Sequence, residues 1–305
     1  MSLLIVGSVA LDSIKTPYGG HSDILGGSAV HASMSASFHS PVNLVGVVGD
    51  DFPQEHVDFL SLRGIDVSGL EIVEGKTFRW AGYYENDMNQ AHTLDTQLNV
   101  FADFVPKIPV KYQESKYLFL GNIHPVLQLD VLNKLSRPEL VAMDTMNFWI
   151  DSQKEALSEV VKNVDILFIN DAELRQYTNE SNLINAARTV LNQGLKYVIV
   201  KKGEHGSMII GDNLFFACPA FPVDKLADPT GAGDTFAGGF MGYVAKTKDM
   251  TEENLKKALV VGTIMSSFNV EAFSLNRLKT LTIEEVAHRY NSLRAFTSFT
   301  DHVFE

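Results

Sequence analysis

Short runs of apolar residues that end in glycine or polar residues recur along the chain, at 3–6, 42–48, 117–120, 140–144, 165–170 and 197–203. Runs of this length are typical of strands buried on both faces, and such strands usually belong to parallel sheets. Segments with a helical pattern follow several of them, for example 29–38 and 49–62. The repeated order of strand and helix predicts an α/β protein with a central, mostly parallel sheet and helices on both faces.

Residues 72–101 interrupt this order of strand and helix. Segments 77–84 and 92–101 are rich in β-forming residues and flank a polar turn at 86–89. This pattern predicts a set of antiparallel strands. We therefore expect one α/β domain formed by residues 1–70 and 105–305, with a small β-stranded insertion at 71–104.

The composition permits a large core and argues against several classes of protein. With 305 residues, 45% of them hydrophobic, the chain can bury a large apolar interior. A net charge of −12 without a Lys/Arg cluster argues against a nucleic-acid partner. No apolar stretch reaches the length of a membrane span, so no membrane partner is expected. Nine histidines lack the spacing of a transition-metal site.

The expected location is the cytoplasm. The single cysteine, Cys218, has no partner for an internal disulfide. The N-terminus lacks a basic region followed by a long apolar run, which is the pattern of a secretory signal.

The segment 228–236, Asp-Pro-Thr-Gly-Ala-Gly-Asp-Thr-Phe, carries the clearest chemistry. Gly231, Ala232 and Gly233 allow a tight turn and a close approach to a ligand, and an apolar helix is predicted after them. The free N–H groups of such a helix start attract anions, above all phosphate. Asp234 is then either the N-cap of the helix or a general base beside a bound phosphate, and the spacing alone favours the cap.

Two familiar phosphate motifs are absent from this segment. No glycine-rich run ends in Gly-Lys-Ser/Thr, and Phe236 stands where the dinucleotide fingerprint requires its third glycine. The segment instead closely resembles the C-terminal signature of the ribokinase-like (PfkB-type) kinases, which use ATP to phosphorylate a primary alcohol of a sugar or nucleoside. The resemblance implies that Asp234 is the base and that the amides of Gly231, Ala232, Gly233 and Asp234 hold the transferring phosphoryl group.

The acceptor side also resembles this family. Asp12 aligns with the family Asp that binds substrate hydroxyls, although an Asp near a strand end more often organises a loop. Gly26 and Gly27 resemble the N-terminal Gly-Gly motif that lines the sugar pocket. Ribose-specific members carry Lys and Asn where this chain has Ser28 and His31. These departures argue against ribose itself and leave Ser28 and His31 as candidate acceptor contacts.

Three further residues bear on the acceptor. Asn122 follows a predicted strand, where ligands bind in open α/β sheets, although it serves a loop equally well. Phe78 and Trp80 belong to the insertion that the resemblance identifies as a lid. Aromatic residues on a strand are usually core or dimer contacts, but one that faces the cleft would stack on a planar base. This feature favours a nucleoside over a free sugar.

The donor side carries a shorter motif. Asn170-x-x-Glu173 is either an ordinary helix cap or the family motif that orients water around Mg²⁺ and the phosphates. Lys202, Gly203 and Gly206 lie where the family packs its backbone against the nucleotide, although a hairpin turn needs glycine in any case. ATP with Mg²⁺ is therefore expected.

Two candidate contacts for cofactor groups lie near the C-terminal end of the chain. Gly262 and Ser266 are one helical turn apart and either admit the adenine ring or serve helix packing. Asp228 and nearby carbonyls are a candidate potassium site, as in several relatives.

The sequence thus predicts an ATP-dependent phosphotransferase that acts on a primary hydroxyl of a nucleoside or sugar. One alternative is a sugar kinase of the same family with a fructose-like or other non-ribose acceptor. Another is a sensor that binds a sugar or nucleotide without catalysis, which the intact Asp234 and Asn170-x-x-Glu173 disfavour. The resemblance further implies a homodimer formed through the lid.

Overall fold

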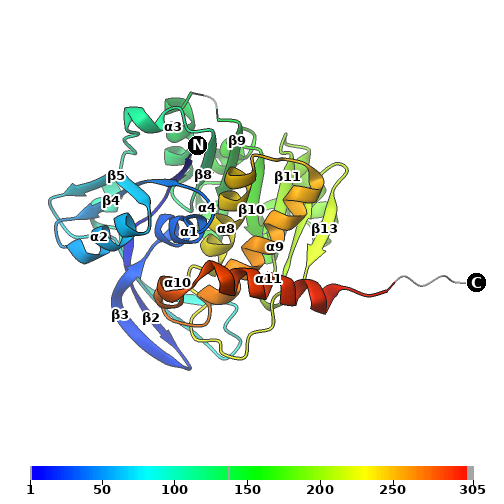
Figure 1. Ribbon diagram of the computed structural model, residues 1–305. Coiled ribbons are helices and arrows are strands. Elements are labelled where there is room, and N and C mark those ends of the chain that lie inside the picture. The colour runs from blue at the N-terminus through cyan, green and yellow to red at the C-terminus, as the bar shows by residue number, and fades with distance from the viewer. Residues whose placement is uncertain (1, 137, 301–305) are drawn as a thin grey trace, which may run out of the picture.

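The computed structural model describes residues 2–136 and 138–300, which form a large central sheet flanked by helices (Figure 1). Nine strands make up this sheet, in the order β13 (Phe215–Cys218), β12 (Ser207–Ile210), β11 (Tyr197–Lys201), β10 (Ile166–Asn170), β9 (Leu140–Asp144), β8 (Tyr117–Leu120), β1 (Leu3–Val6), β4 (Val42–Gly49) and β5 (Ile65–Val73). β12 pairs antiparallel with both of its neighbours. All the other neighbouring pairs are parallel.

The apolar runs of the sequence form the centre of this sheet. Every residue of β1 is fully buried because helices cover both faces there. Leu3 and Ile5 pack with one group of helices: α1 (Ser28–Ala36), α2 (Gln54–Leu62), α8 (Ala232–Thr247), α9 (Glu252–Asn269), α10 (Asn276–Thr280) and α11 (Ile283–Thr297). Leu4 and Val6 point the other way, as expected for alternating residues of a strand. They pack with α3 (Pro125–Lys134), α4 (Asn147–Ser152), α5 (Lys154–Val161), α6 (Asp171–Thr178) and α7 (Leu183–Leu191).

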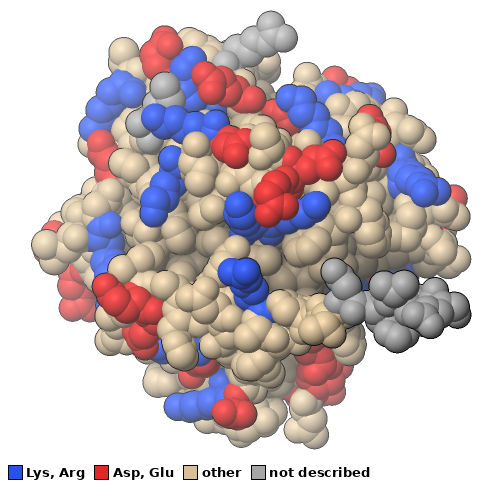
Figure 2. Space-filling model, turned by 45° about the vertical axis from the view of Figure 1, so that its right-hand side comes forward, with Lys and Arg blue, Asp and Glu red and all other residues tan. Residues whose placement is uncertain are grey.

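This arrangement confirms the expected α/β class with helices on both faces. The described part of the chain also contains three short 3₁₀ helices: η1 (Asn99–Asp103), η2 (Val110–Tyr112) and η3 (Gly203–His205). No helix in the described part of the chain combines the length and the apolar character needed to cross a membrane. On the face shown in Figure 2, basic and acidic side chains are interspersed.

Small residues bring α1, α8 and α9 unusually close together. An added Cβ at Gly238 of α8 would overlap the backbone of Ala32 in α1. At Gly262 of α9 it would lie 2.8 Å from the carbonyl oxygen of Phe236 in α8. Contacts this short are possible only without a side chain, so these glycines set the spacing of the helices that carry the site.

A second sheet has four strands, in the order β3 (Gly19–Gly26), β2 (Ala10–Thr16), β6 (Arg79–Tyr84) and β7 (Ala91–Gln97). The segment expected as the insertion, 71–104, supplies only β6 and β7, while β2 and β3 come from a region expected in the main domain. The cause is the parallel pairing of β2 with β6, which joins segments far apart in the chain and leaves no local sequence pattern. In Figure 1 this sheet extends below the central sheet.

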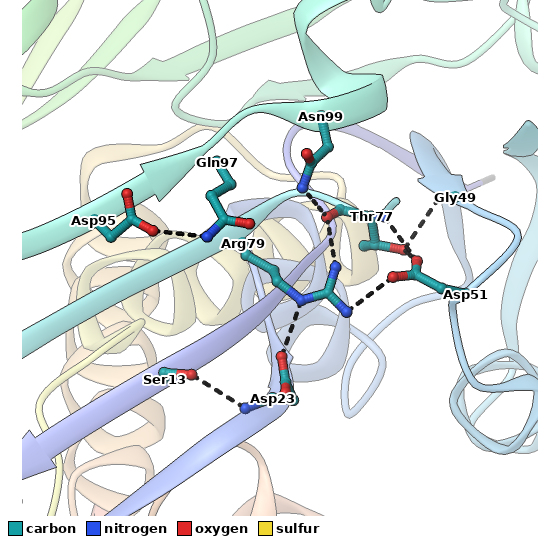
Figure 3. A network of polar contacts seen from close by, with 9 residues as sticks. All are labelled: Ser13, Asp23, Gly49, Asp51, Thr77, Arg79, Asp95, Gln97 and Asn99. Carbon is teal, nitrogen blue, oxygen red and sulfur yellow. Dashed lines mark hydrogen bonds and ion pairs between the residues drawn. The ribbon is translucent and has the colours of Figure 1, made fainter. Parts of the chain in front are cut away.

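A polar network ties the small sheet to the central one (Figure 3). Arg79 at the start of β6 pairs with Asp23 of β3 at 3.0 Å and with Asp51, which follows β4, at 2.8 Å. Asp51 also accepts hydrogen bonds from the backbone and hydroxyl of Thr77, at 2.7 and 2.6 Å. The Thr77 hydroxyl in turn accepts a 3.1 Å bond from the amide of Gly49. Arg79 therefore bridges both sheets at the point where the chain passes between them.

Candidate active site

The glycine turn of segment 228–236 leads directly into α8, which begins at Ala232. Gly231 is the N-cap residue and has a φ of 72°, while Asp234 lies in the first turn of the helix. Asp234 is therefore not the N-cap. First-turn amides such as those of Gly233 and Asp234 have no preceding helical carbonyl to bond, so the turn presents donors to an anion.

Only glycine fits at position 231. Its backbone is in the left-handed region, and an added Cβ would overlap the ring of His31. His31 is 2% exposed and contacts Asn269 through Nδ1 at 3.1 Å. Because Asn269 Oδ1 only accepts hydrogen bonds, His31 Nδ1 is the donor. His31 thus lies behind the glycine turn, a position that explains its presence without a contact to the acceptor.

Asn269, at the end of α9, links several parts of this turn. Its Oδ1 accepts a 3.1 Å hydrogen bond from the Thr235 hydroxyl, and its amide group donates a 2.8 Å bond to the carbonyl of Thr230. Asn269 is fully buried, so the loss of these bonds would leave unpaired polar groups in the core. No local pattern in the sequence marks this residue, because its partners are far away in the chain.

A partly buried lysine, Lys201, lies beside the turn. It was not identified as a candidate from the sequence. Lys201 Nζ pairs with Asp144 Oδ2 at 2.5 Å, and an added Cβ at Gly233 would lie 3.0 Å from the same nitrogen. Lys201 ends β11 and Asp144 ends β9. Polar residues that end apolar runs at the same edge of a parallel sheet are the signal that identifies such a pair.

The carboxylates around Lys201 carry perturbed pKa values. The pKa of Asp234 is raised to about 7. Burial is the main cause, and the nearby charge of Asp144 adds to it against the opposing effect of Lys201. Burial likewise raises the pKa of Glu173 to about 7, again against the effect of Lys201. Burial alone would lower the pKa of Lys201, but Asp144 and Glu173 raise it. Asp144, Glu173 and Asp234 thus all interact electrostatically with Lys201.

Asp12 is the acceptor contact that the sequence predicts. It is 5% exposed in β2, and an added Cβ at Gly26 would overlap its carboxylate. Burial raises the pKa of Asp12 to about 7, with further contributions from the charges of Asp228 and Asp234. The effect of Asp234 on the pKa of Asp12 indicates that the fold brings the two carboxylates into one region, although they are far apart in the chain.

The Gly26–Gly27 pair and Ser28 form a tight corner beside Asp12. Gly27 has a φ of 98°, and an added Cβ would overlap the carbonyl of Ser8. Ser28 exchanges hydrogen bonds with Ser8: its amide donates to the Ser8 hydroxyl at 2.9 Å, and its hydroxyl accepts from the Ser8 amide at 3.0 Å. The side chain of Ser28 therefore holds the start of α1 against the end of β1.

Asn122 follows β8 and is engaged by aromatic and sulfur partners. Its Oδ1 accepts a 2.9 Å hydrogen bond from the indole of Trp149, and its amide contacts Met146 Sδ at 3.0 Å. Trp149 also packs against His124 and Phe148, with ring centroids 4.9 and 4.8 Å apart. This aromatic group adjoins Gly121, which in turn contacts Ser28.

The lid aromatics lie in different directions. Trp80 pairs in register with Asp12, so both side chains point to the same face of the small sheet. On that face, Trp80 and Tyr84 pack beside Ile14 and Phe273. Phe78 instead stacks on Phe101 of η1, at 5.2 Å between ring centroids. Of the two predicted lid residues, Trp80 is thus the one directed toward the acceptor side.

The donor-side motif forms a complete capping box. Asn170 Oδ1 accepts from the Glu173 amide at 2.8 Å, and Glu173 Oε2 accepts from the Asn170 amide at 3.0 Å. The cap interpretation of Asn170-x-x-Glu173 is therefore met. The second interpretation is compatible with it, since the Glu173 carboxylate also lies close enough to Lys201 to affect its pKa.

The remaining donor-side candidates lie in two places. Gly203 and Gly206 have φ values of 54° and 87°, and with Lys202 they form the turn between β11 and β12. Gly262 contacts Phe236 across the α8–α9 interface, as described above, and the Ser266 hydroxyl donates to the carbonyl of Thr263 at 3.0 Å. Helix packing thus accounts for the position of Gly262.

Asp228 is fully buried beside the glycine turn. It accepts hydrogen bonds from the amides of Thr230 at 2.9 Å and Ser274 at 3.3 Å. Within residues 2–136 and 138–300, no three His, Cys, Asp or Glu side chains come together in a group suited to a metal ion.

Together, the sheet, the separate lid-like sheet and the glycine turn define a ribokinase-like protein, and comparison with solved structures agrees. The crystal structure of Methanocaldococcus jannaschii nucleoside kinase, an archaeal member of the ribokinase family, matches with a TM-score of 0.77 at 24% identity, over 95% of this chain and 98% of that one. Ribokinase from Thermotoga maritima matches with a TM-score of 0.75 at 20% identity, over 95% and 99% of the two chains.

Sequence comparison specifies the family. Residues 12–280 match the profile of the pfkB family carbohydrate kinases. A cytidine kinase from Thermococcus kodakarensis is 31% identical over 258 residues, which cover 83% of this chain and 91% of that protein. The chain belongs to the pfkB family of carbohydrate kinases and is a kinase.

Proposed function

We propose that the protein transfers the γ-phosphoryl group of ATP to the primary hydroxyl of a nucleoside. The observation that carries this proposal is the position of Asp234, in the first turn of α8, beside Lys201 and within electrostatic reach of Asp12. A carboxylate with a pKa near 7 is suited to accept a proton at neutral pH. The similarity to the Thermococcus cytidine kinase supports a nucleoside acceptor, and a pyrimidine nucleoside in particular.

In the proposed reaction, Asp12 accepts hydrogen bonds from acceptor hydroxyls and Gly26 and Gly27 bring the backbone close to the sugar. Asp234 takes the proton of the primary hydroxyl as its oxygen attacks the γ-phosphorus. The amides of the Gly231–Asp234 turn stabilise the charge that develops on the phosphoryl oxygens. Lys201 holds Asp144 and keeps a positive charge beside this turn.

Mg²⁺ supplies the charge that neutralises the phosphates of ATP. Glu173 would hold it through water, because its carboxylate lies within electrostatic reach of Asp144 and Lys201. We place the nucleotide along the turn formed by Lys202, Gly203 and Gly206. Asp228 and the neighbouring carbonyls are our candidate site for K⁺.

The small sheet acts as the lid in this proposal and includes β2 and β3 as well as β6 and β7. Trp80 would contact the base, because its ring lies on the face that carries Asp12. A homodimer through this sheet remains a prediction, which sedimentation of the purified protein tests directly: a monomer at all concentrations contradicts it.

A panel of acceptors tests the function. The purified protein is incubated with Mg²⁺ and ATP, with and without K⁺, and with cytidine, uridine, adenosine, inosine, ribose or fructose. ADP and phosphorylated products are then measured. We expect a nucleoside 5′-monophosphate as the main product. Turnover of a free sugar alone would favour the sugar-kinase alternative, and absence of ATP consumption with every acceptor would favour the sensor.

A further inference from the structure

Two contacts between the lid and the body of the protein lie away from the Arg79 junction. At its tip, between β6 and β7, Asn89 reaches Glu204 of η3 at 3.4 Å, and an added Cβ at Gly203 would lie 2.6 Å from Asn89 Oδ1. Met88 beside it is only 4% exposed, although Asp87 and Asn89 on either side are exposed. The tip is therefore docked against the body, and the lid is closed.

The second contact joins the lid to the glycine turn itself. The hydroxyl of Thr230 donates a 3.1 Å hydrogen bond to the hydroxyl of Tyr84, the last residue of β6. Both residues are partly buried. Thr230 immediately precedes Gly231, so this bond connects the lid to the segment that forms the anion-binding turn.

Thr230 is held at three points, and only one of them belongs to the lid. Its amide donates to Asp228 at 2.9 Å and its carbonyl accepts from Asn269 at 2.8 Å, and both partners are part of the body. Among the described residues, its hydroxyl bonds to that of Tyr84. When the lid opens, this third bond must break, while the other two remain.

We propose that Tyr84 is a positioning residue that couples closure of the lid to the geometry of the anion-binding turn. With the lid closed, its hydroxyl fixes Thr230 and thereby the direction of the amides that follow. With the lid open, the turn keeps two of its three anchors and is less well ordered. The turn is then complete only when an acceptor is enclosed, which disfavours transfer of the phosphoryl group to water. This inference rests on the proposed function.

A double-mutant cycle tests the coupling. Tyr84→Phe and Thr230→Val each remove one hydroxyl, and the double variant removes both. A neutral hydrogen bond contributes about 0.5–1.5 kcal/mol, so each single variant should lower kcat about two- to thirteenfold. The double variant should be no slower than the worse single variant, because both remove the same bond. KM for ATP and for the acceptor should stay within about twofold of the wild type.

Tyr83→Phe is the matched control. Tyr83 precedes Tyr84 on the same strand but points to the other face, where its ring stacks on His92 at 4.9 Å. The control should leave kcat unchanged, and Thr230→Ser, which keeps the hydroxyl, should retain most of it. Multiplying losses in the double variant, an unchanged kcat in Tyr84→Phe, or an effect confined to the KM of the acceptor would each overturn the proposal.

A second measurement separates this proposal from the proposed function. Amide hydrogen exchange of residues 229–235 reports the order of the turn without any turnover. Tyr84→Phe should exchange faster there than Tyr83→Phe does. If the wild type phosphorylates no acceptor, the proposed function fails and this comparison alone decides the coupling. If exchange in the two variants is equal, the coupling fails whatever the activity.

Discussion

Asp234 occupies a position at which a carboxylate is costly for the fold. The residue is partly buried beside Asp144, and desolvation together with the charge of Asp144 raises its pKa from the usual 3.8 to about 7. Because its surroundings destabilise the charged form of the carboxylate, Asp234 does not stabilise the folded state at neutral pH. Its presence is explained by the chemistry proposed for it.

Removal of this carboxylate should abolish most activity without harm to the fold. Asp234→Asn keeps the shape of the side chain but cannot accept the proton of the acceptor hydroxyl. The loss of a general base typically costs about 10²–10⁴-fold. We therefore expect kcat to fall by this factor while binding of ATP, measured by calorimetry, is retained. Turnover close to the wild type would remove Asp234 from its assigned role.

The same variant should be more stable than the wild type at alkaline pH. The folded-state pKa of about 7 lies above the unfolded value of 3.8, so the folded state binds the proton more tightly. The stability contributed by this group is therefore lost as pH rises from about 4 through 7. At pH 8, Asp234→Asn should gain on the order of 1 kcal/mol, and this gain should shrink toward pH 5. Thermal melts across this range measure the difference, and a gap that widens at low pH would contradict the sign.

Lys201 should matter for stability more than any exposed lysine. Its side chain is 17% exposed and that of Asp144 is 4% exposed. Lys201→Met would leave buried carboxylates without their cation, and loss of one partner of a buried pair costs about 3 kcal/mol. Lys196→Met is the control, because its pair with Asp165 has a lysine that is 59% exposed and should contribute less than about 1 kcal/mol. Equal urea midpoints for the two variants would contradict this account.

Among the elements, the helices α1, α8 and α9 position the site by their close packing. The glycine turn is part of α8, His31 lies on α1 and Asn269 ends α9. Small residues at the contacts let these three helices approach, and the network around Asn269 then spans all of them. The geometry of the turn therefore depends on interhelical distances.

Gly238→Ala tests this packing by the sign of its effect. In an exposed helix interior, alanine is more stable than glycine by about 0.5–1 kcal/mol. At position 238 the added Cβ would overlap the backbone of Ala32, and neither backbone can move aside easily. We expect a loss of about 2 kcal/mol or more in urea unfolding. A gain in stability would show that α1 and α8 are not in contact at this position.

At the scale of the whole molecule, two sheets must move relative to one another if the lid opens. Arg79 spans their junction through Asp23 and Asp51, whose side chains are partly or largely exposed (Figure 3). Exposed ion pairs contribute little to global stability. Their effect should therefore appear in the local opening of the lid.

Arg79→Gln should loosen the lid while the core stays intact. We expect faster amide exchange in β6 and β7 and a change below about 1 kcal/mol in global unfolding. Lys107→Gln is the control, because Lys107 pairs with Glu71 away from the junction. Uniform loss of protection throughout the molecule would mean that the network supports the fold as a whole. Unchanged exchange in β6 and β7 would mean that it does not hold the lid.

The class of fold and the main catalytic candidate, Asp234, could both be predicted from the sequence. Apolar runs such as 3–6 and 140–144 predict buried strands because their residues are hydrophobic on both faces. The turn at Gly231 and the acid at Asp234 are adjacent in the chain, so a local pattern is enough to find them.

Contacts between residues far apart in the chain could be identified from the folded structure but not from the sequence. Lys201 and Asn269 have partners that lie far from them in the chain, so the fold decides which groups they meet. The small sheet includes β2 and β3 because β2 pairs with β6, which lies far from it in the chain. The hydrogen bond between Thr230 and Tyr84 likewise forms only because the fold places the lid next to the turn that precedes α8. Periodicity along a chain records which face of an element is buried, whereas the partner on that face is set by packing.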